Sequence, residues 1–151
     1  MDRMDRALAD SLWHDGASVD YVGVYQGSSE GFLDWVWTMH AELQTHSHQI
    51  TNVLCDVNGS EAASEAYVTV ALWTCPDESG ARTEITARGR YLDSWSRKAG
   101  RWAIDRRTYI TDMQNRETIQ SGEQPPGGTR DQDDPSYRVL PTSFGMPKLD
   151  K

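Results

Sequence analysis

Two stretches near the start of the chain carry apolar residues at helical spacing. In residues 5–13 the apolar side chains fall on one face of a helix, and Gly16 follows at a position where helices commonly end. Residues 30–43 repeat apolar side chains at steps of three and four, and Ser28 or Ser29 can cap the first turn. We predict a short helix over the first stretch and an amphipathic helix over the second.

The remaining apolar residues follow the pattern of strands, with many β-branched and aromatic side chains. We predict strands over residues 19–25, 46–57, 65–73, 83–97 and 101–110. The Asn58-Gly59 and Ala99-Gly100 pairs lie between such runs, where they favour antiparallel hairpins. Helices followed by a series of antiparallel strands predict an α+β fold, in which helices pack on one face of a curved sheet and a pocket forms between them.

The pattern changes near the end of the chain. Residues 121–135 are rich in Gly, Pro, Gln and Asp without periodicity, which predicts an extended linker. Apolar residues return at 137–146, and we expect them to dock across a pocket mouth or onto a neighbouring subunit. The predicted organisation is one domain over residues 1–116 and an extended tail over residues 117–151.

Composition narrows the partners and the location. The 151 residues carry 15 basic and 23 acidic side chains, and this formal net charge of −8 argues against nucleic acid and anionic membranes as partners. No apolar run approaches the roughly 20 residues of a membrane span, and charged residues occupy the first positions, where a signal peptide needs an apolar run. We expect a cytoplasmic protein, with Cys55 and Cys75 as buried free thiols in strands.

The segment around His46 and His48 is the best candidate for chemistry. The two histidines are two residues apart in a predicted strand and share one face. A metal site is a weak interpretation, because no nearby Cys, Asp or Glu has the spacing to complete a ligand set. We interpret His46 as a surface residue. For His48 we predict proton transfer, because imidazole titrates near neutral pH and can both take and give a proton.

Other polar residues could support such a base. Adjacent strand residues point to opposite faces, so only one of Asp20 and Tyr21 faces the pocket, and we favour Tyr21 as a donor to a substrate oxygen. Asp2 can either cap the first helix or pair with a histidine. Arg107 is our candidate for holding an anionic intermediate. Nucleophile elbows, phosphate loops and dinucleotide glycine motifs do not occur in the sequence.

The order of several short motifs resembles the SnoaL-like branch of the nuclear-transport-factor-like superfamily over roughly residues 2–112. In chain order these motifs are Asp2, Leu12-Trp13, Val19-Asp20-Tyr21, the Trp-rich helix, Thr45-x-x-His48-x-x-x-Asn52, Gly89-Arg90-Tyr91 and Gly100-Arg101-Trp102. The chain is similar in this respect to scytalone dehydratase, bile-acid 7α-dehydratase and the lyases that act on lignin-derived diaryl compounds. The resemblance implies a cone-shaped curved sheet and places the family's first helix before Met1.

The same resemblance implies a site and a reaction. His48 falls on the family's catalytic histidine, Tyr21 on a tyrosine that orients a water, and Asp2 on an acidic partner of the histidine. Scytalone dehydratase has a second histidine where this chain has Trp73. The implied activity is a cofactor-free elimination, a dehydration or a release of formaldehyde, on a small hydrophobic, ring-bearing, hydroxylated compound. The residues expected to bind that compound are Tyr25, Trp35, Trp37, Asn52, Trp73, Tyr91 and Arg107.

Two other functions remain open within this resemblance. The fold also hosts ketosteroid isomerase, which moves a proton without elimination, and it serves non-catalytically as a ligand-binding protein or as the small subunit of ring-hydroxylating dioxygenases. Fold alone does not separate these functions. The resemblance also implies a homo-oligomer, with a trimer favoured over a dimer.

Overall fold

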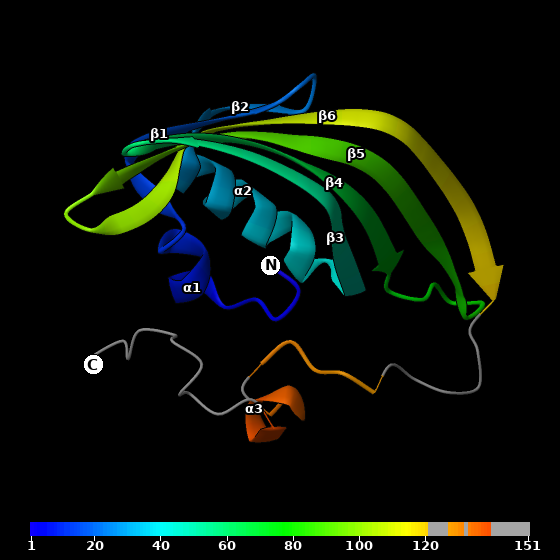
Figure 1. The fold of residues 1–151 in the computed structure, drawn as a ribbon. Helices are drawn as coiled ribbons and strands as arrows, with labels where there is room; N and C mark the ends of the chain where they lie inside the picture. Colours follow the sequence, from blue (N-terminus) through cyan, green and yellow to red (C-terminus); the bar gives the residue numbers. More distant parts are fainter. Residues whose placement is uncertain (121–126, 132, 140–151) are drawn as a thin grey trace.

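The computed structural model describes residues 1–120, 127–131 and 133–139, which form a curved six-stranded sheet and three helices (Figure 1). The elements are α1 (Arg6–Asp10), β1 (Trp13–Tyr21), β2 (Tyr25–Ser28), α2 (Ser29–Ala41), β3 (Leu43–Asn58), β4 (Glu61–Thr74), β5 (Ala81–Lys98), β6 (Arg101–Gln120) and α3 (Ser136–Val139). In the part of the chain described here, every helix is too short or too polar to span a bilayer.

The sheet has the strand order β2-β1-β6-β5-β4-β3, so its two edges are β2 and β3. The only parallel pair in this sheet joins β1 to β6, and all other neighbours are antiparallel. Helix α2 follows β2 directly and leads into β3, so it crosses the concave face from one edge to the other (Figure 1). The predicted α+β class, with helices on the concave face of a curved sheet, is confirmed.

Several local predictions hold. Helix α2 covers residues 29–41, and the Ser28 hydroxyl accepts a hydrogen bond from the Gly31 amide at 3.1 Å, as a cap should. The turn after Asn58 joins β3 to β4. At the β5–β6 turn, Ala99 and Gly100 both have positive φ, which matches the twist of a two-residue hairpin loop.

The first forty residues contain two corrections. Helix α1 ends at Asp10, and Trp13 already belongs to β1, so the predicted helix over residues 5–13 is too long. Gly16 has φ +76° inside β1, where the pairing with β6 shifts register, and it therefore forms a bulge instead of a helix end. The predicted strand over residues 19–25 is divided by a turn at Gly23, which has φ +77°.

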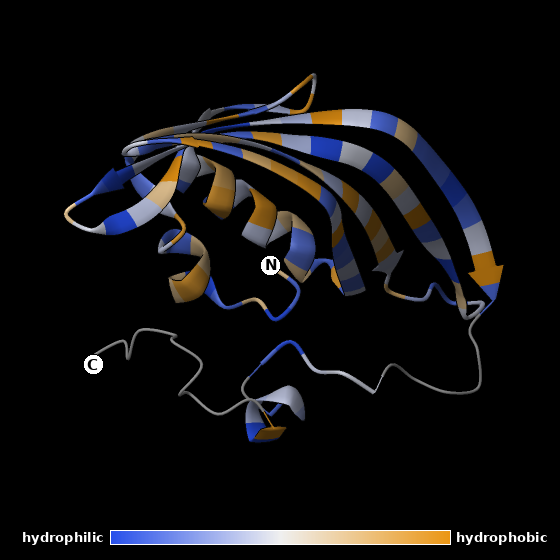
Figure 2. Ribbon diagram, in the orientation of Figure 1, coloured by the Kyte–Doolittle hydropathy of each residue, from blue (hydrophilic) through white to orange (hydrophobic). Residues whose placement is uncertain are grey.

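The core lies between α2 and the concave face of the sheet. Phe32, Val19, Val68 and Ile104 are its largest fully buried side chains. Burying each such side chain contributes about 1.5–3 kcal/mol. Hydrophilic and hydrophobic residues alternate along the strands (Figure 2), which is the pattern of a sheet with one buried and one solvated face.

The last strand and the tail also differ from the prediction. Strand β6 pairs with β5 as far as Gln120, ten residues beyond the predicted strand end at residue 110. In the described tail, Arg130 donates to the carbonyls of His40 and Leu43 at 2.6 and 2.7 Å. The expected docking of residues 140–146 and part of the expected linker, residues 121–126 and 132, lie outside the described residues.

Both cysteines are free thiols, as predicted, but they are exposed. Cys55 lies in the outer half of the edge strand β3, where every residue from Gln49 onward is exposed, and Cys75 follows the end of β4. The prediction that both thiols are buried is therefore wrong. An edge strand has only one covering neighbour, so its side chains gain less burial than those of a central strand.

Candidate active site

Asp2 and His48 form a hydrogen-bonded pair at the concave face. The carboxylate Oδ1 of Asp2 lies 2.5 Å from Nδ1 of His48, and its Oδ2 accepts the backbone N–H of His48 at 2.9 Å. Burial of the carboxyl raises its pKa, but the hydrogen bonds from His48 outweigh that effect, so the pKa of Asp2 lies below its usual value. An ionised carboxylate on Nδ1 fixes the imidazole in one tautomer, with Nε2 as the basic nitrogen. Of the two alternatives for Asp2, helix cap or histidine partner, the structure has the histidine partner.

His46 lies beside this pair and is buried, so the expectation of a surface histidine is wrong. Its side chain is fully buried, with Nε2 3.4 Å from the Met1 carbonyl and 3.8 Å from Oδ1 of Asp2. The ring of His40, from α2, lies 4.2 Å away between centroids. Burial lowers the pKa of His46 and lowers that of His40 to about 3, with further lowering at His40 from the charges of the other two histidines. Both rings are therefore neutral at pH 7.

These three histidines and Asp2 do not constitute a metal centre. Among the residues that the structure describes, no group of three or more His, Cys, Asp or Glu side chains has the arrangement to hold a metal ion. The cluster instead supports the N-terminal segment: His46 contacts the Met1 carbonyl, and His48 binds Asp2 through both its ring and its backbone N–H.

Strands β5 and β6 supply a second set of polar groups on the same face. Asp93 and Arg107 are register partners in the sheet, and Nε and Nη2 of Arg107 donate to the two carboxylate oxygens at 2.8 and 2.7 Å. The guanidinium carbon lies 4.1 Å from the centre of the Tyr91 ring. Burial of the guanidinium lowers its pKa, but Asp93 more than offsets this and the pKa of Arg107 is raised. Arg107 therefore stays charged inside the fold.

Tyr21 lies next to Tyr91, with ring centroids 6.3 Å apart. A side-chain hydrogen bond joins the two phenols, and Tyr21 also packs against Phe32 and Tyr109, with ring centroids 4.6 and 4.7 Å away. Burial raises the pKa of Tyr21 well above its ordinary value, so its hydroxyl keeps its proton. Gly89 makes room for this group of rings, because a Cβ atom there would lie 2.3 Å from the Ile110 carbonyl oxygen and 2.7 Å from the Tyr109 ring.

These groups meet at one cavity of about 370 Å³ on the concave face. Its described lining residues are Met1, Asp2, His48, Ile50, Val53, Ser64, Ala66, Tyr91, Asp93, Trp95 and Arg107. Of the predicted site residues, the structure thus brings together Asp2, His48, Tyr91 and Arg107. A cavity of this size with a mainly apolar wall and a few converging polar groups is typical of a small-molecule site.

The other predicted aromatic residues lie away from this cavity. Tyr25 stacks on Trp35 at 5.6 Å, and both rings pack against the core near the β2 edge. Trp37 also packs against the core and lies under the guanidinium of Arg6 at 5.7 Å. Trp35 and Trp37 are thus only partly buried beside the core, and neither they nor Tyr25 line the wall beside His48.

Trp73 and Asn52 are also absent from the lining. Trp73 donates its indole N–H to Glu84 and carries Arg82 over its ring, near the far end of β4. Asn52 is exposed at a bulge in β3 and has φ +49°, a conformation that asparagine tolerates better than most residues. The extra residue in this bulge lets Val53 line the cavity.

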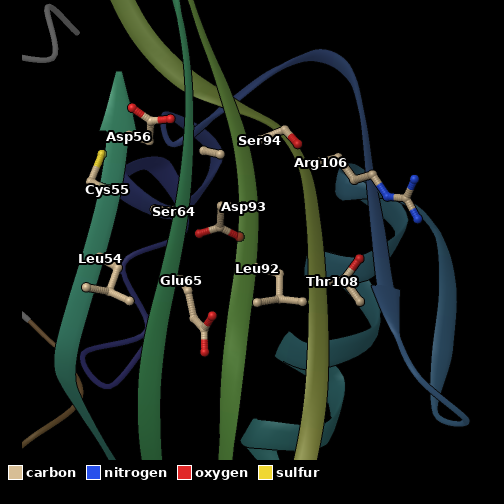
Figure 3. A pocket seen from close by; sticks show the side chains of 11 residues that line it. Leu54, Cys55, Asp56, Ser64, Glu65, Leu92, Asp93, Ser94, Arg106 and Thr108 are labelled. Carbon is tan, nitrogen blue, oxygen red and sulfur yellow. The ribbon is translucent and has the colours of Figure 1, made fainter. Parts of the chain in front are cut away.

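The convex face carries a larger hollow of about 630 Å³, which shares the lining residues Ser64 and Asp93 with the cavity (Figure 3). Leu54, Glu65, Leu92, Arg106 and Thr108 line it from four neighbouring strands. Helix α2 lies behind the sheet in this view, on the opposite side from the hollow. The predicted division of Arg106 and Arg107 between the two faces is therefore confirmed.

Sequence reasoning missed three polar or aromatic members of the cavity, Ser64 on β4 and two residues on β5. The two on β5 are Asp93 and Trp95. Both alternate with Tyr91 along β5, so the period of two places all three on one face. This alternation could be read from the sequence. The pairing of Asp93 with Arg107 could not, because it depends on the hairpin register and on a register shift between Ser94 and Trp95.

A family model, the SnoaL-like domain, matches residues 1–108, and the chain belongs to this family. The match covers both Asp2 and Arg107, so every residue that lines the cavity lies within it. A search of curated proteins finds no match.

Solved structures share the fold. A candidate scytalone dehydratase from Novosphingobium aromaticivorans has a TM-score of 0.62 and 19% identity, over 80% of this chain and 78% of that one. LinA has a TM-score of 0.69 and 18% identity, over 82% and 84%. A hexachlorocyclohexane dehydrochlorinase, LinA-type3, from Novosphingobium barchaimii has a TM-score of 0.65 and 18% identity, over 83% and 84%. At these identities the similarity establishes the fold, and the chemistry has to be argued from the site.

Proposed function

We propose that the protein is a cofactor-free lyase that eliminates water or formaldehyde from a small, ring-bearing, hydroxylated compound. The observation that carries the proposal is the Asp2–His48 pair, with its 2.5 Å contact, at the wall of a 370 Å³ cavity. A histidine held by a carboxylate is a general base whose ring cannot turn away from the substrate. The dehydratase and dehydrochlorinase neighbours, both elimination enzymes by name, agree with this class of reaction.

The proposed reaction starts with proton removal by Nε2 of His48. The proton comes from carbon, the C–H electron pair forms the new double bond, and the C–O bond on the neighbouring carbon breaks. The leaving oxygen takes the proton from the imidazolium and departs as water. In the alternative, His48 removes the proton of a hydroxymethyl group, and the C–C bond breaks to release formaldehyde. The electron pair of that bond stays on the remaining carbon, which takes the proton back from the imidazolium. In both cases Asp2 stabilises the imidazolium between the two proton transfers.

Tyr91 and Arg107 are proposed to hold the substrate oxygen that gains charge. Both line the cavity, and their stacking at 4.1 Å directs the phenol and the guanidinium to the same region. Donors fixed in place before the reaction stabilise a developing oxyanion without reorganisation. Tyr21, which our sequence prediction placed against the substrate, is instead a positioning residue in this proposal, since it acts through its hydrogen bond to Tyr91.

The partner in this proposal is a small hydrophobic molecule. Ile50, Val53, Ala66 and Trp95 supply the apolar wall on which a ring can lie. We also propose that the protein works as a homo-oligomer, with three copies favoured over two.

A substrate screen read by mass spectrometry tests the proposal. Wild type, His48→Gln and His14→Gln are offered hydroxylated steroids, cyclic polyketides and lignin-type diaryl diols. His14 is a suitable control because it is also buried but lies on β1, where it bonds the Ser96 carbonyl at 2.9 Å. We expect a product lighter by water or formaldehyde with wild type and His14→Gln, and a loss of at least about 100-fold with His48→Gln.

Other outcomes would contradict the lyase. A product of unchanged mass that depends on His48 would indicate an isomerase of the ketosteroid type. No turnover by wild type, together with ligand binding that His48→Gln retains, would indicate a ligand-binding protein or a dioxygenase small-subunit role.

A further inference from the structure

The charged side chains of the cavity indicate which charge its substrate can carry. This inference rests on the proposed function of the site. The buried guanidinium of Arg107 is a potential anchor for a carboxylate, because a guanidinium forms two parallel hydrogen bonds with such a group. In this fold that position is already occupied. Asp93 accepts from Nε and Nη2 of Arg107 at 2.8 and 2.7 Å, and its own side chain is only 4% exposed.

The pair is built into the sheet and does not depend on flexible side chains. Asp93 on β5 and Arg107 on β6 are direct register partners, so the backbone ladder sets their separation. Tyr91 covers one face of the guanidinium at 4.1 Å, and Trp13 lies 5.6 Å from the guanidinium carbon. A substrate carboxylate that binds the Nε–Nη2 edge of Arg107 would have to displace Asp93 and leave a second carboxylate buried without its partner, which is unfavourable.

Asp2 adds a second negative charge to the same wall. Its pKa is held below the usual value by His48, so it remains ionised at neutral pH. The lining side chains thus include the carboxylates of Asp2 and Asp93 and the guanidinium of Arg107. Repulsion between an anionic ligand and these carboxylates is stronger in a partly desolvated cavity than in bulk water.

We propose that this cavity selects uncharged ring compounds and rejects their carboxylates, and that Asp93 is the residue that determines this specificity. The neutral ligand uses the apolar wall of Ile50, Val53 and Trp95 for its rings. One hydroxyl or carbonyl oxygen is placed near Tyr91. Asp93 touches neither the substrate nor its reacting atoms; it acts by neutralising Arg107.

Isothermal titration calorimetry with two matched probes tests the proposal on the wild-type protein. The probes are 2-naphthol, which is uncharged at pH 7, and 2-naphthoate, which has the same rings and carries a full charge. We expect 2-naphthol to bind at least about tenfold more tightly. Equal or tighter binding of 2-naphthoate would overturn the proposal, and so would failure of both probes to bind.

An Asp93→Asn variant assigns the discrimination to one residue. It removes one negative charge and frees the guanidinium, so we expect at least a tenfold gain in affinity for 2-naphthoate and less than a threefold change for 2-naphthol. The control is Asp56→Asn, which makes the same charge change in β3 at a residue that lines hollows other than this cavity. The same gain with Asp56→Asn would show an effect of overall charge and refute the role of Asp93.

The wild-type pair of titrations decides the question even where Asp93→Asn does not fold. The result is also separable from the proposed reaction, because binding is measured without turnover and can be repeated with His48→Gln. A protein that discriminates the two probes and turns over no substrate would refute the lyase and leave this inference intact. A lyase that binds 2-naphthoate as well as 2-naphthol would do the reverse.

Discussion

At the scale of single residues, the site depends on a contact between positions 46 apart in the chain. Asp2 reaches His48 only because the N-terminal segment runs along the concave face, where the Met1 carbonyl meets His46. The residue types were suggestive in the sequence, since a lone acidic residue and a strand histidine are a common acid–base pair. The choice between a helix cap and a histidine partner for Asp2 required the tertiary structure.

Replacing Asp2 by Asn tests the role of the carboxylate. The amide keeps the size but can present its NH₂ group to Nδ1, which favours the wrong tautomer, so we expect kcat to fall by about 100-fold or more. Steady-state kinetics on the substrate found in the screen measures this loss. Asp5→Asn is the matched control, because Asp5 caps α1 through a bond from the Leu8 amide at 2.9 Å and asparagine caps equally well. An unchanged kcat in Asp2→Asn would exclude a catalytic carboxylate.

The histidine cluster makes a prediction about stability and pH. His40 has a pKa of about 3 in the fold against 6.5 in the unfolded chain, so the unfolded state binds the proton first as pH falls. Stability from this site is therefore complete above pH 6.5 and is lost as pH falls from there toward 3. Between pH 7.5 and 5 we expect the free energy of unfolding to drop by about 2 kcal/mol from His40 alone.

Urea unfolding of wild type and His40→Leu at both pH values measures this effect. The variant keeps the carbonyl that Arg130 binds and removes only the ring, so its stability is expected to vary less between the two pH values. This window lies above the range in which the carboxyls with lowered pKa, such as Asp2 and Asp105, take up protons. The same pH dependence in both proteins would show that His40 is not the source.

At the scale of elements, the period of the apolar residues predicted α2 and the strands β3, β4 and β5, but only the first half of β6. It failed where strands are short or bulged. Trp13 and the residues before it satisfied a helical pattern over too few turns to decide, and the parallel pairing of β1 with β6 determined the conformation of Trp13. The turn at Gly23 was missed because apolar residues on both sides continued the strand pattern across it.

Asn52, in the bulge of β3, could act through its side chain or through its backbone conformation. Our sequence prediction gave its side chain to the substrate, whereas its φ of +49° and its exposed position indicate a role for the backbone. Asn52→Gly adopts this conformation freely, so we expect unchanged activity and stability. Asn52→Ala is expected to lose about 1 kcal/mol of stability, because alanine keeps the Cβ that disfavours positive φ but lacks the short polar side chain that compensates for it in asparagine. Thermal unfolding and kcat are the measurements, and loss of activity in Asn52→Gly would support the side-chain role.

At the scale of the whole molecule, the class of fold followed from the order of elements, and the shape of the cavity did not. The cone depends on bulges in β1, β3 and β6. Each bulge inserts extra residues that shift the pairing register, and the period of the apolar residues does not predict where such an insertion occurs. Four of the ten predicted site residues line the cavity, whereas the predicted tryptophans pack against the core or lie near the far end of β4.

The last prediction concerns the open convex face of the sheet. On this side of the sheet, near the hollow of Figure 3, Leu54 is 68% and Tyr67 43% exposed. Exposure of these apolar side chains to water is unfavourable, and contact with another copy of the chain would bury them. Light scattering after gel filtration is expected to give the mass of three chains. Because each copy carries a net charge of −8, raising the salt concentration should strengthen the assembly.

Leu54→Lys places a charge on this face, in the edge strand β3, and is expected to dissociate the trimer. Val22→Lys makes the same charge change at an equally exposed residue, 59% accessible in the β1–β2 turn, and is expected to leave it intact. A wild-type protein that stays monomeric at high salt would contradict the prediction. A trimer that Val22→Lys dissociates and Leu54→Lys does not would move the interface from the convex face to the β1–β2 edge, at the opposite side of the sheet from β3.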